Sequence, residues 1–316
     1  MPKNKDKKDS QFRTSIGGQA LIEGIMMRGP QKTAIAVRGT DGIKLKEQQN
    51  KLIKDKYPIL GWVFIRGVVG FVSSMAVGMK ALTWSAEQMP EDDYEPGKFD
   101  KWMDRHFKNS GKIITGVALV LGLALAIGLF TLLPTFLGSL IAPHIGTRIW
   151  LNLIETGIRL TLLVGYMFLV SRMKDIQRTF AYHGAEHKTI ACYEARKELT
   201  VENVRGFTRL HPRCGTSFLL TVVIVSLLVF MWVTVRDPII RIALRLAVLP
   251  LVVGVSYEIN RLIGRFDNPV TRFFRAPGLW MQHMTTREPD DAMIEVGIAA
   301  MMAVIPEKEG SDDWSK

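Results

Sequence analysis

Residues 113–143 read IITGVALVLGLALAIGLFTLLPTFLGSLIAP, and this stretch without a charged side chain decides the fold class. A second uncharged run, GTSFLLTVVIVSLLVFMWVTV, covers residues 215–235. The hydrocarbon core of a bilayer is about 30 Å thick, and about 20 apolar residues of helix cross it. Each run is long enough for that, so we predict a mainly α-helical, polytopic membrane protein.

The apolar stretches predict about four membrane spans in two helical hairpins, at residues 113–135, 149–171, 216–235 and 239–259. Residues 58–87 are ambiguous, because their apolar centre at 67–79 is short for a span and is bracketed by Arg66 and Lys80. We favour an interfacial or re-entrant helix there.

Short β-prone runs between Ile16 and Gln49 predict a small cytoplasmic β-meander ahead of the spans, with a hairpin turn at residues 39–42, GTDG. The predicted organisation is, in chain order, a disordered basic tail (1–14), a small cytoplasmic β segment (15–56), an interfacial helix with a linker (57–111), the four-span membrane domain (112–260) with a cytoplasmic loop at 172–214, a cytoplasmic C-terminal segment (261–305) and a disordered tail (306–316).

The chain has 41 Lys and Arg against 30 Asp and Glu, a formal net charge of +11. Basic residues flank the predicted inner ends of the spans, at 101–112, 172–174, 205–213 and 261–275. The outer turns carry only Arg148 and Arg236, so the positive-inside rule places both termini in the cytoplasm. We expect the membrane, including anionic lipid, as a partner. Contact with the ribosome stays open, and nothing indicates DNA.

Several classes of protein are disfavoured. Cys192 and Cys214 fall in segments predicted to be cytoplasmic, so no disulfide is expected. The polar N-terminus has no apolar core and does not resemble a signal peptide. The chain lacks a Walker A loop, a CxxC pair and a G-x-S-x-G elbow, which argues against nucleotide hydrolysis, dithiol redox exchange and a serine-hydrolase mechanism.

Two predicted spans contain charges one helical turn apart, Glu155 with Arg159 and Arg241 with Arg245. Charges inside a membrane usually pair within the bundle. Because Glu155 and Arg245 lie at similar depth, we predict that they meet. A structural ion pair that fixes helix register is favoured over transport or proton relay.

The densest polar cluster is YHGAEHK at residues 182–188. On a helix, His183, Glu186, His187 and Glu194 fall within one stripe about 100° wide. Two imidazoles one turn apart can hold Zn²⁺, with the intervening Glu as general base, as in the H-x-x-E-H motif. The alternative is a polar face that hydrogen-bonds neighbouring loops. Cys192 points away from the stripe and is excluded as a ligand.

Two further motifs could complete a metal site. HPRCG at residues 211–215 offers His211 and Cys214 as ligands, although Cys214 could equally be a small buried apolar residue. Glu258, at the inner end of the fourth span, could be a ligand, a partner that orients a histidine, or one side of a helix-end salt bridge.

The last motif is PGLWMQHMTTREP at residues 277–289. Residues 286–291 are typical of a helix N-terminus, and the helix beyond, 291–304, is apolar nearly all round, so we expect it to be buried. Gln282 and His283, just upstream, are candidates for the site.

Taken together, the motifs resemble those of the YqhQ family of bacterial membrane proteins over roughly residues 15–305. They are GGQA at 17–20, EGIMMRGP at 23–30, YHGAEHK at 182–188, HPRCGTS at 211–217, YE at 257–258, PG at 277–278 and TTREP at 285–289. That family is described as a domain of unknown function and as predicted metal-dependent enzymes. The resemblance implies a multi-pass protein of the bacterial inner (plasma) membrane.

The first functional hypothesis is a zinc-dependent membrane hydrolase that acts at the cytoplasmic face on a lipid-linked or membrane-peptide substrate. His183 and His187 would be metal ligands, and His211, Cys214 or Glu258 would complete the shell. Glu186 would be the general base. Glu23 or His283 would be a group on the substrate side.

The second hypothesis is a non-catalytic factor for membrane-protein assembly or envelope homeostasis, whose polar face binds a protein partner and whose basic tail binds lipid or the ribosome. A transporter ranks third, because four spans without internal repeats fit it poorly.

Overall fold

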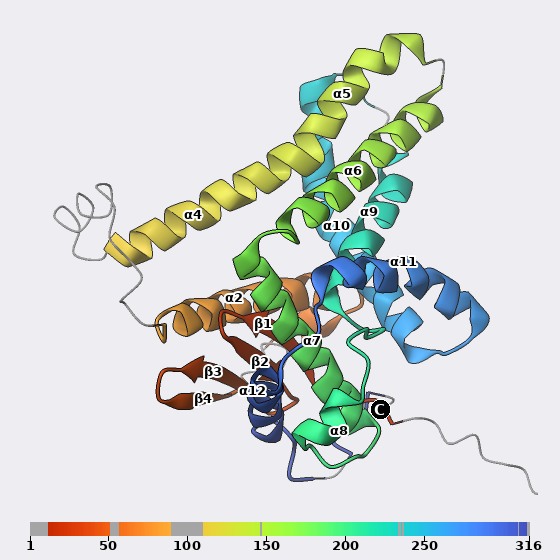
Figure 1. The fold of residues 1–316 in the computed structure, drawn as a ribbon. Helices are drawn as coiled ribbons and strands as arrows, with labels where there is room; N and C mark the ends of the chain where they lie inside the picture. Colours follow the sequence, from red (N-terminus) through yellow and green to blue (C-terminus); the bar gives the residue numbers. More distant parts are fainter. Residues whose placement is uncertain are drawn as a thin grey trace, which may run out of the picture.

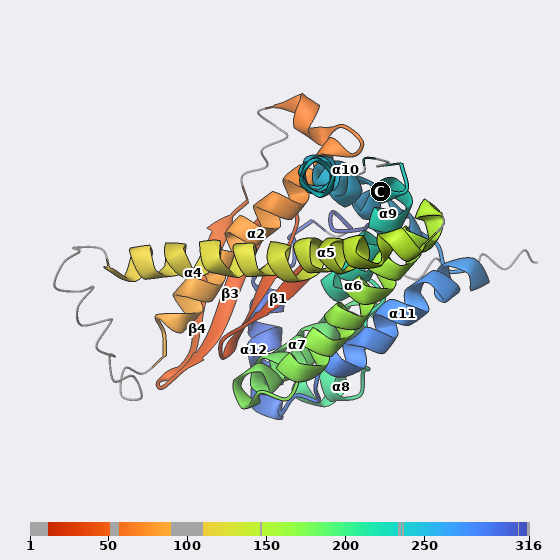
Figure 2. The same ribbon diagram turned by 90° about the horizontal axis from the view of Figure 1, so that it is seen from above.

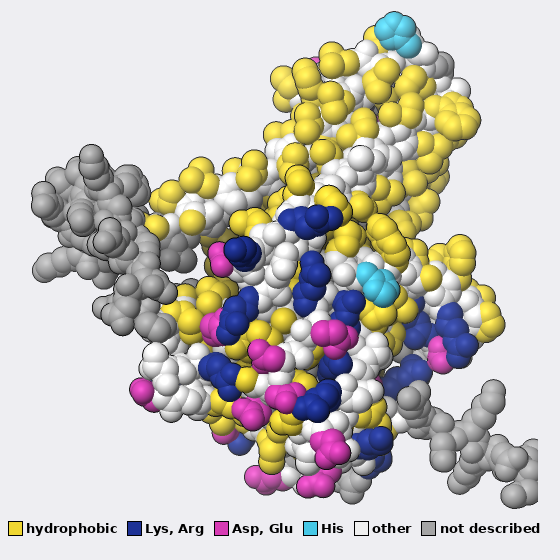
Figure 3. Space-filling model, viewed as in Figure 1, with side chains coloured by type: hydrophobic (Ala, Val, Ile, Leu, Met, Phe, Trp, Pro, Cys, Tyr) yellow, Lys and Arg dark blue, Asp and Glu magenta, His cyan; other side chains and the backbone are white. Residues whose placement is uncertain are grey.

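The computed structural model describes residues 12–50, 57–89, 110–145, 147–232, 235, 237–308 and 310–314. Most of the predicted basic tail and of the linker before residue 110 lies outside these residues. The described chain forms a sheet-bearing part and an elongated bundle of apolar helices that rises from it (Figure 1). Figure 3 shows apolar side chains over the bundle and mixed charges over the sheet-bearing part.

The N-terminal sheet is antiparallel, with the order β1-β2-β3-β4, and it confirms the predicted meander. Its strands are β1 (Gly17–Leu21), β2 (Gly24–Arg28), β3 (Lys32–Gly39) and β4 (Gly42–Gln49). The predicted hairpin joins β3 to β4, with Gly39 opposite Gly42. Gly42 has φ of +116°, a conformation that glycine adopts without steric cost.

Helices cover both faces of this sheet, which explains why β2 is almost entirely buried. Ile25 and Met27 pack against α7 (Lys174–Glu194) and α12 (Asp291–Met302). Met26, which points to the opposite face, packs against Ala81 of α2 (Ile65–Ala86). The expected burial of the helix after residue 290 is confirmed, because α12 packs against both α7 and the sheet.

The bundle contains helices that are long and apolar enough to cross a membrane. Its elements are α4 (Ser110–Ile127), the π-helical turn η3 (Gly128–Leu132), α5 (Leu133–Ile141), the short η4 (Ala142–His144), α6 (Arg148–Val170), α9 (Gly215–Phe230) and α10 (Pro238–Arg265). Among the described residues, four candidate spans result: Ile65–Ala86, Gly116–His144, Ile149–Val170 and Ile239–Arg265.

The number of candidate spans agrees with the prediction, but their identity differs. The expected span at 216–235 contains α9, a helix of 16 residues that ends at Phe230. The segment for which an interfacial or re-entrant helix was favoured forms α2, an unbroken helix of 22 residues that is long and apolar enough to be a candidate span. Arg66 lies in the first turn of α2 and forms an ion pair with Glu258 of α10.

α2 lies across the bundle, between the bundle and the sheet (Figures 1 and 2). It follows the short η1 (Pro58–Gly61), packs against α10 near its start, and reaches the sheet near its end. Its remaining surface exposes apolar side chains, including Phe71, Val72 and Met75.

α11 (Pro269–Thr285) also leaves the bundle sideways, near the end that adjoins the sheet-bearing part (Figure 1). Its N-terminus has a capping box made by Asn268 and Thr271. Val270, Phe273, Phe274 and Trp280 of this helix are more than half exposed.

The chain end differs from the expected disordered tail at 306–316. Asp312 is buried, and its carboxylate accepts hydrogen bonds from the hydroxyls of Thr14 at 2.6 Å and Tyr193 at 3.0 Å. The backbone N–H of Trp314 donates to the carbonyl of Arg13 at 2.9 Å. Residues 12–15 and 310–314 therefore stabilise each other, a pairing that neither segment reveals in sequence.

Candidate metal centre

The candidate centre is built on α7, which follows α6 after a turn at residues 171–173. His183 and His187 lie one turn apart on α7, and their ring centroids are 4.3 Å apart. The same face of α7 meets the loop that precedes α9. α7 thus carries both imidazoles into the sheet-bearing part, beside the end of the bundle.

Cys214 joins the two histidines. It is the N-cap residue of α9, and its Sγ lies 3.2 Å from Nε2 of His183. One donor atom from each of His183, His187 and Cys214 lies within 4.8 Å of the others. In the described part of the chain this is the one group of three His, Cys, Asp or Glu residues that converges in this way.

Backbone carbonyls orient both imidazoles. Nδ1 of His183 is 2.8 Å from the carbonyl oxygen of Thr285, and Nδ1 of His187 is 2.6 Å from that of Arg209. A carbonyl oxygen only accepts hydrogen bonds, so each Nδ1 carries the proton and each Nε2 keeps its lone pair. Metal-binding histidines commonly use this arrangement, which fixes the tautomer and the ring orientation.

The donor set fits a zinc ion. Two imidazole nitrogens and one thiolate sulfur form a Cys-His₂ ligand set, and sites with three protein ligands keep a fourth position open for water or substrate. The hydrogen bonds at Nδ1 supply the second layer of support that such a site requires.

Glu186 lies between the two histidines on α7 and is 5% exposed. The backbone of Gly18 in β1 packs directly against the side chain of Glu186. A Cβ atom on Gly18 would lie only 2.9 Å from the carboxyl carbon of Glu186. Burial raises the pKa of Glu186 to about 7, although a hydrogen bond from the backbone of Gly18 favours the ionised form.

The group lines a pocket of about 530 Å³ between α7, the start of the sheet and the start of α9. His183, Glu186, His187, His211 and Cys214 all contribute to its wall. Ser15 to Ala20, Arg213 and Trp314 line it as well, so both ends of the described chain border the pocket.

His211 lies beside the donor group, with its ring centroid 5.5 Å from that of His187. Its Nε2 faces Oε2 of Glu194 at 3.6 Å, beyond hydrogen-bond distance. Burial lowers the pKa of His211 to about 4, so the ring is neutral near pH 7. His211 therefore packs beside His187 and is not one of the three convergent donors.

Two side chains outside the donor group hold this region in place. Gln282 of α11 accepts from the backbone N–H of His211 and donates to its carbonyl, both at 2.8 Å. Glu194 accepts from the backbone of Thr14 at 2.8 Å and from the guanidinium of Arg213. Burial raises the pKa of Glu194, but the positive charge of Arg213 opposes this effect, and the net shift is downward.

Glu258 lies away from the donor group. Its two carboxylate oxygens accept from Nε and Nη2 of Arg66 at 2.7 and 2.6 Å. Glu258 was considered as a metal ligand, as a residue that orients a histidine, or as one side of a salt bridge. The structure supports the salt bridge, because both carboxylate oxygens bind Arg66 of α2.

Glu23 and His283 also lie outside the pocket. Glu23, in the β1–β2 turn, accepts from Arg178 and from the hydroxyl of Tyr182, which fastens the sheet to α7. His283 is exposed on α11, although its neighbour Gln282 is buried in the site.

The sequence reasoning missed the groups that orient the histidines. They are backbone carbonyls of Thr285 and Arg209, together with the guanidinium of Arg209, which donates to the carbonyl and hydroxyl of Thr286. Every residue type has a backbone carbonyl, so the sequence does not show which carbonyl accepts a hydrogen bond from a histidine. Glu194 did carry a signal, because it falls on the histidine stripe.

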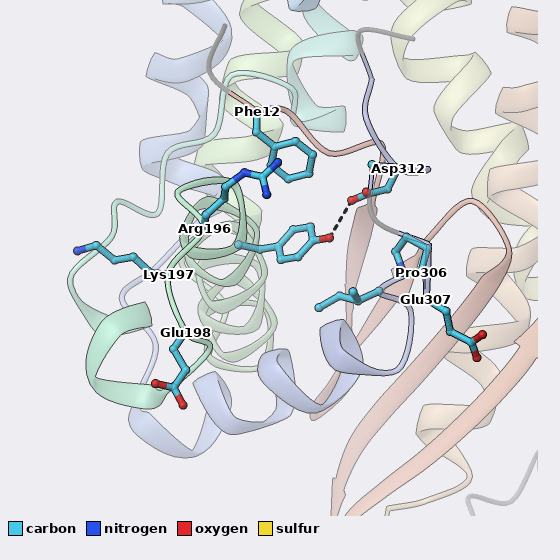
Figure 4. A pocket seen from close by; sticks show the side chains of 10 residues that line it. Phe12, Arg196, Lys197, Glu198, Pro306, Glu307 and Asp312 are labelled. Atoms are coloured by element: carbon cyan, nitrogen blue, oxygen red, sulfur yellow. Dashed lines mark hydrogen bonds between the residues drawn. The ribbon is translucent and has the colours of Figure 1, made fainter. Parts of the chain in front are cut away.

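A second pocket, of about 400 Å³, lies at the other end of α7 (Figure 4). Phe12, Lys197, Glu198 and Pro306 are among its lining residues. Tyr193 also lines it and donates a hydrogen bond from its hydroxyl to Asp312. The described residues around it include no convergent set of His, Cys or carboxylate donors.

With the geometry in place, comparisons with known proteins assign the chain to a family. A family described as "Protein of unknown function (DUF1385)" matches residues 62–307. The chain is also 38% identical over 296 residues to a protein of Bacillus subtilis (strain 168) described as "Uncharacterized protein YqhQ", and the match covers 90% of each chain. The chain belongs to this family. The resemblance to the YqhQ family is thereby confirmed, and no solved structure matches the chain.

Proposed function

We propose that this family member is a multi-pass protein of the bacterial inner membrane and that it acts at the cytoplasmic face as a zinc-dependent hydrolase. The convergence of His183, His187 and Cys214 beside Glu186 in one pocket carries the enzymatic part of this proposal.

The membrane location is supported by the bundle surface. α4 exposes Val120, Leu121, Leu123 and Leu125, each by more than half, a surface that suits lipid rather than water. α2 and α11 leave the bundle sideways near the end that adjoins the sheet and expose aromatic side chains, as helices in the membrane interface do. The basic residues around the sheet-bearing part favour the cytoplasm for it.

The chemistry proposed for the pocket is hydrolysis. A bound Zn²⁺ would activate water and polarise the bond to be cleaved. Glu186 suits a general base, because burial raises its pKa to about 7, where it can take a proton from water and return it to the leaving group. The nearby interfacial helices favour a lipid-linked or membrane-peptide substrate.

Metal analysis tests the ligand set. We expect detergent-purified wild-type protein to contain about one zinc per chain, and the His183→Ala, His187→Ala and Cys214→Ala variants to lose most of it. His283→Ala is the matched control, because His283 is exposed and lies outside the pocket. A wild-type protein that stays metal-free when purified with added zinc would sink the proposal.

A separate variant tests catalysis. Glu186→Gln should keep its zinc and its fold, yet fail to replace the wild type in a deletion strain, because it cannot accept a proton. If Glu186→Gln complements fully, Glu186 is not the base and the hydrolase assignment fails even if zinc is bound.

A second candidate function is a non-catalytic membrane-assembly factor. It is favoured by β4, whose eight residues are all exposed and which forms an outer edge of the described sheet. A partner strand can pair with such an edge. Leu45 is exposed on β4. Co-purification of a stoichiometric protein partner with the wild type, but not with Leu45→Lys, would support this function. Full complementation by Leu45→Lys would count against it.

A further inference from the structure

A cluster of four charged side chains lies inside the helical bundle, apart from the metal centre. Glu155 and Arg159 come from α6, and Arg241 and Arg245 come from α10. Their exposed fractions are 1%, 5%, 7% and 1%, in that order. All four side chains therefore lie in candidate membrane spans and are more than nine-tenths buried.

The cluster has one carboxylate for three guanidinium groups among the described residues. Glu155 pairs with Arg245 at 2.6 Å, which confirms the predicted contact, and lies 3.6 Å from Arg241. Neutral groups add to the contacts of these two arginines. Arg245 donates to the hydroxyl of Thr135 and to the side-chain oxygen of Asn152, and Arg241 donates to the carbonyl of Thr135. Among the described residues, two of the three positive charges therefore have no counter-charge.

Arg159 is the least satisfied member. Its one hydrogen bond among the described residues is from Nη1 to the hydroxyl of Ser226, at the limiting distance of 3.5 Å. Its Nε and Nη2 have no hydrogen-bond partner in the described chain. Its guanidinium carbon lies 5.1 Å from the ring centre of Phe230, and that of Arg245 lies 5.2 Å from the same ring. Two like charges thus flank one aromatic side chain.

The unpaired edge of Arg159 is the edge by which other arginines in this chain hold anions. Nε and Nη2 each donate to one oxygen of a carboxylate in Arg66–Glu258, Arg178–Glu23, Arg205–Asp291 and Arg272–Asp267. The two donors have a fixed spacing that matches carboxylate and phosphate oxygens. Arg159 presents the same pair of donors within the bundle.

Uncompensated charge is costly at such a position. Moving an ion from water into a low-dielectric interior is unfavourable even after relaxation, and hydroxyls or carbonyls reduce this cost without cancelling the charge. An anion would cancel it and would also satisfy the free edge of Arg159.

We propose that Arg159, Arg241 and Arg245, with Glu155 holding Arg245 in place, form a binding site for a phosphate-type anion within the helical bundle. The phosphate could belong to a soluble phosphate or phosphate ester, or to the headgroup of an anionic lipid. The site uses other elements than the metal centre and does not depend on the hydrolase assignment.

The test uses the full-length protein and a compensated variant. In detergent at constant ionic strength, replacing chloride by inorganic phosphate should raise the Tm of the wild type by roughly 4 °C or more, as a ligand that binds only the folded state does. Nanodiscs of phosphatidylcholine with and without phosphatidylglycerol provide the lipid arm. A rise in either arm supports the site, and the arm that responds identifies the source.

Ser226→Asp is the decisive variant, because it places a carboxylate beside Arg159 without removing an arginine. It should raise the Tm without added anion and abolish the response. Ser226→Asn is its uncharged control and should respond like the wild type, as should Arg172→Gln, which changes an exposed arginine near the end of α6. Arg159→Gln, if it folds, should also lose the response.

Two results would overturn the proposal. One is a wild type whose Tm responds to neither phosphate nor phosphatidylglycerol. The other is a Ser226→Asp variant that responds as strongly as the wild type, because the anion would then bind elsewhere.

Discussion

Gly184 illustrates, at the scale of a single residue, how close packing positions the metal centre. It lies on α7 beside His183, and a Cβ atom there would come 2.0 Å from the carbonyl oxygen of Arg287. That close approach lets the backbone of Arg287 donate to the carbonyl of Phe180 at 2.8 Å. The segment that orients His183 through Thr285 is thus held against the helix.

Gly184→Ala should therefore destabilise the protein by about 1–3 kcal/mol, the usual range for forcing an extra carbon into a packed site. The matched control is Gly165→Ala on α6, where no described atom lies within 4 Å of the added carbon. That change should leave stability unaltered or raise it by up to about 1 kcal/mol, because alanine favours helix. Thermal unfolding in detergent measures both, and equal effects would contradict the packing argument.

At the scale of the element, α12 contributes a large part of the core beneath the sheet. Met293, Val296, Ala300 and Met301 of α12 pack with side chains from β2, β3 and α7. Two adjacent methionines have the same side chain but differ in burial. Met301 is fully buried, and Met302 is 64% exposed.

We expect Met301→Ala to cost about 2–5 kcal/mol, the range for truncating a buried methionine, and Met302→Ala to stay within about 0.5 kcal/mol of the wild type. The free energy of unfolding, or accumulation of the protein in membranes, reports the difference. Similar losses in the two variants would mean that α12 does not pack as described.

The contact between α2 and α10 depends on the ion pair of Arg66 and Glu258. Its geometry is bidentate, and both side chains are partly buried. Arg66→Glu and Glu258→Arg should each destabilise the protein by about 1–3 kcal/mol, and the double exchange should recover part of that loss.

Zinc content provides the second readout for this pair. All three variants should keep the wild-type zinc content, because Glu258 is not among the convergent donors. The result would be different if Glu258→Arg lost its zinc and the double exchange did not restore it. Glu258 would then have to be a metal ligand.

At the scale of the whole molecule, the arrangement predicts which parts face which side of the membrane. Asp41 lies in the exposed β3–β4 turn, and Thr147 is exposed in the connection before α6, at the opposite end of the bundle from the sheet. In a Cys192→Ser, Cys214→Ser background, a membrane-impermeant maleimide should label Thr147→Cys in intact cells. Asp41→Cys should react only after lysis. The reverse pattern would place the candidate metal centre outside the cytoplasm.

The sequence alone determined the features that depend on local pattern. Uncharged runs indicated apolar helices of membrane-spanning length, short β-prone runs and the 39–42 turn indicated the meander, and helical spacing put His183, Glu186 and His187 on one face of α7. Each follows from the period of a helix or strand, which the chain carries in itself.

Only the tertiary structure decided the features that join residues far apart in the chain. It brought Cys214 to the histidines, paired Glu258 with Arg66, and buried Asp312 against Thr14. Charge pairing and backbone hydrogen bonding act between whichever groups folding brings within a few ångströms. The local order of residues carries no record of those partners.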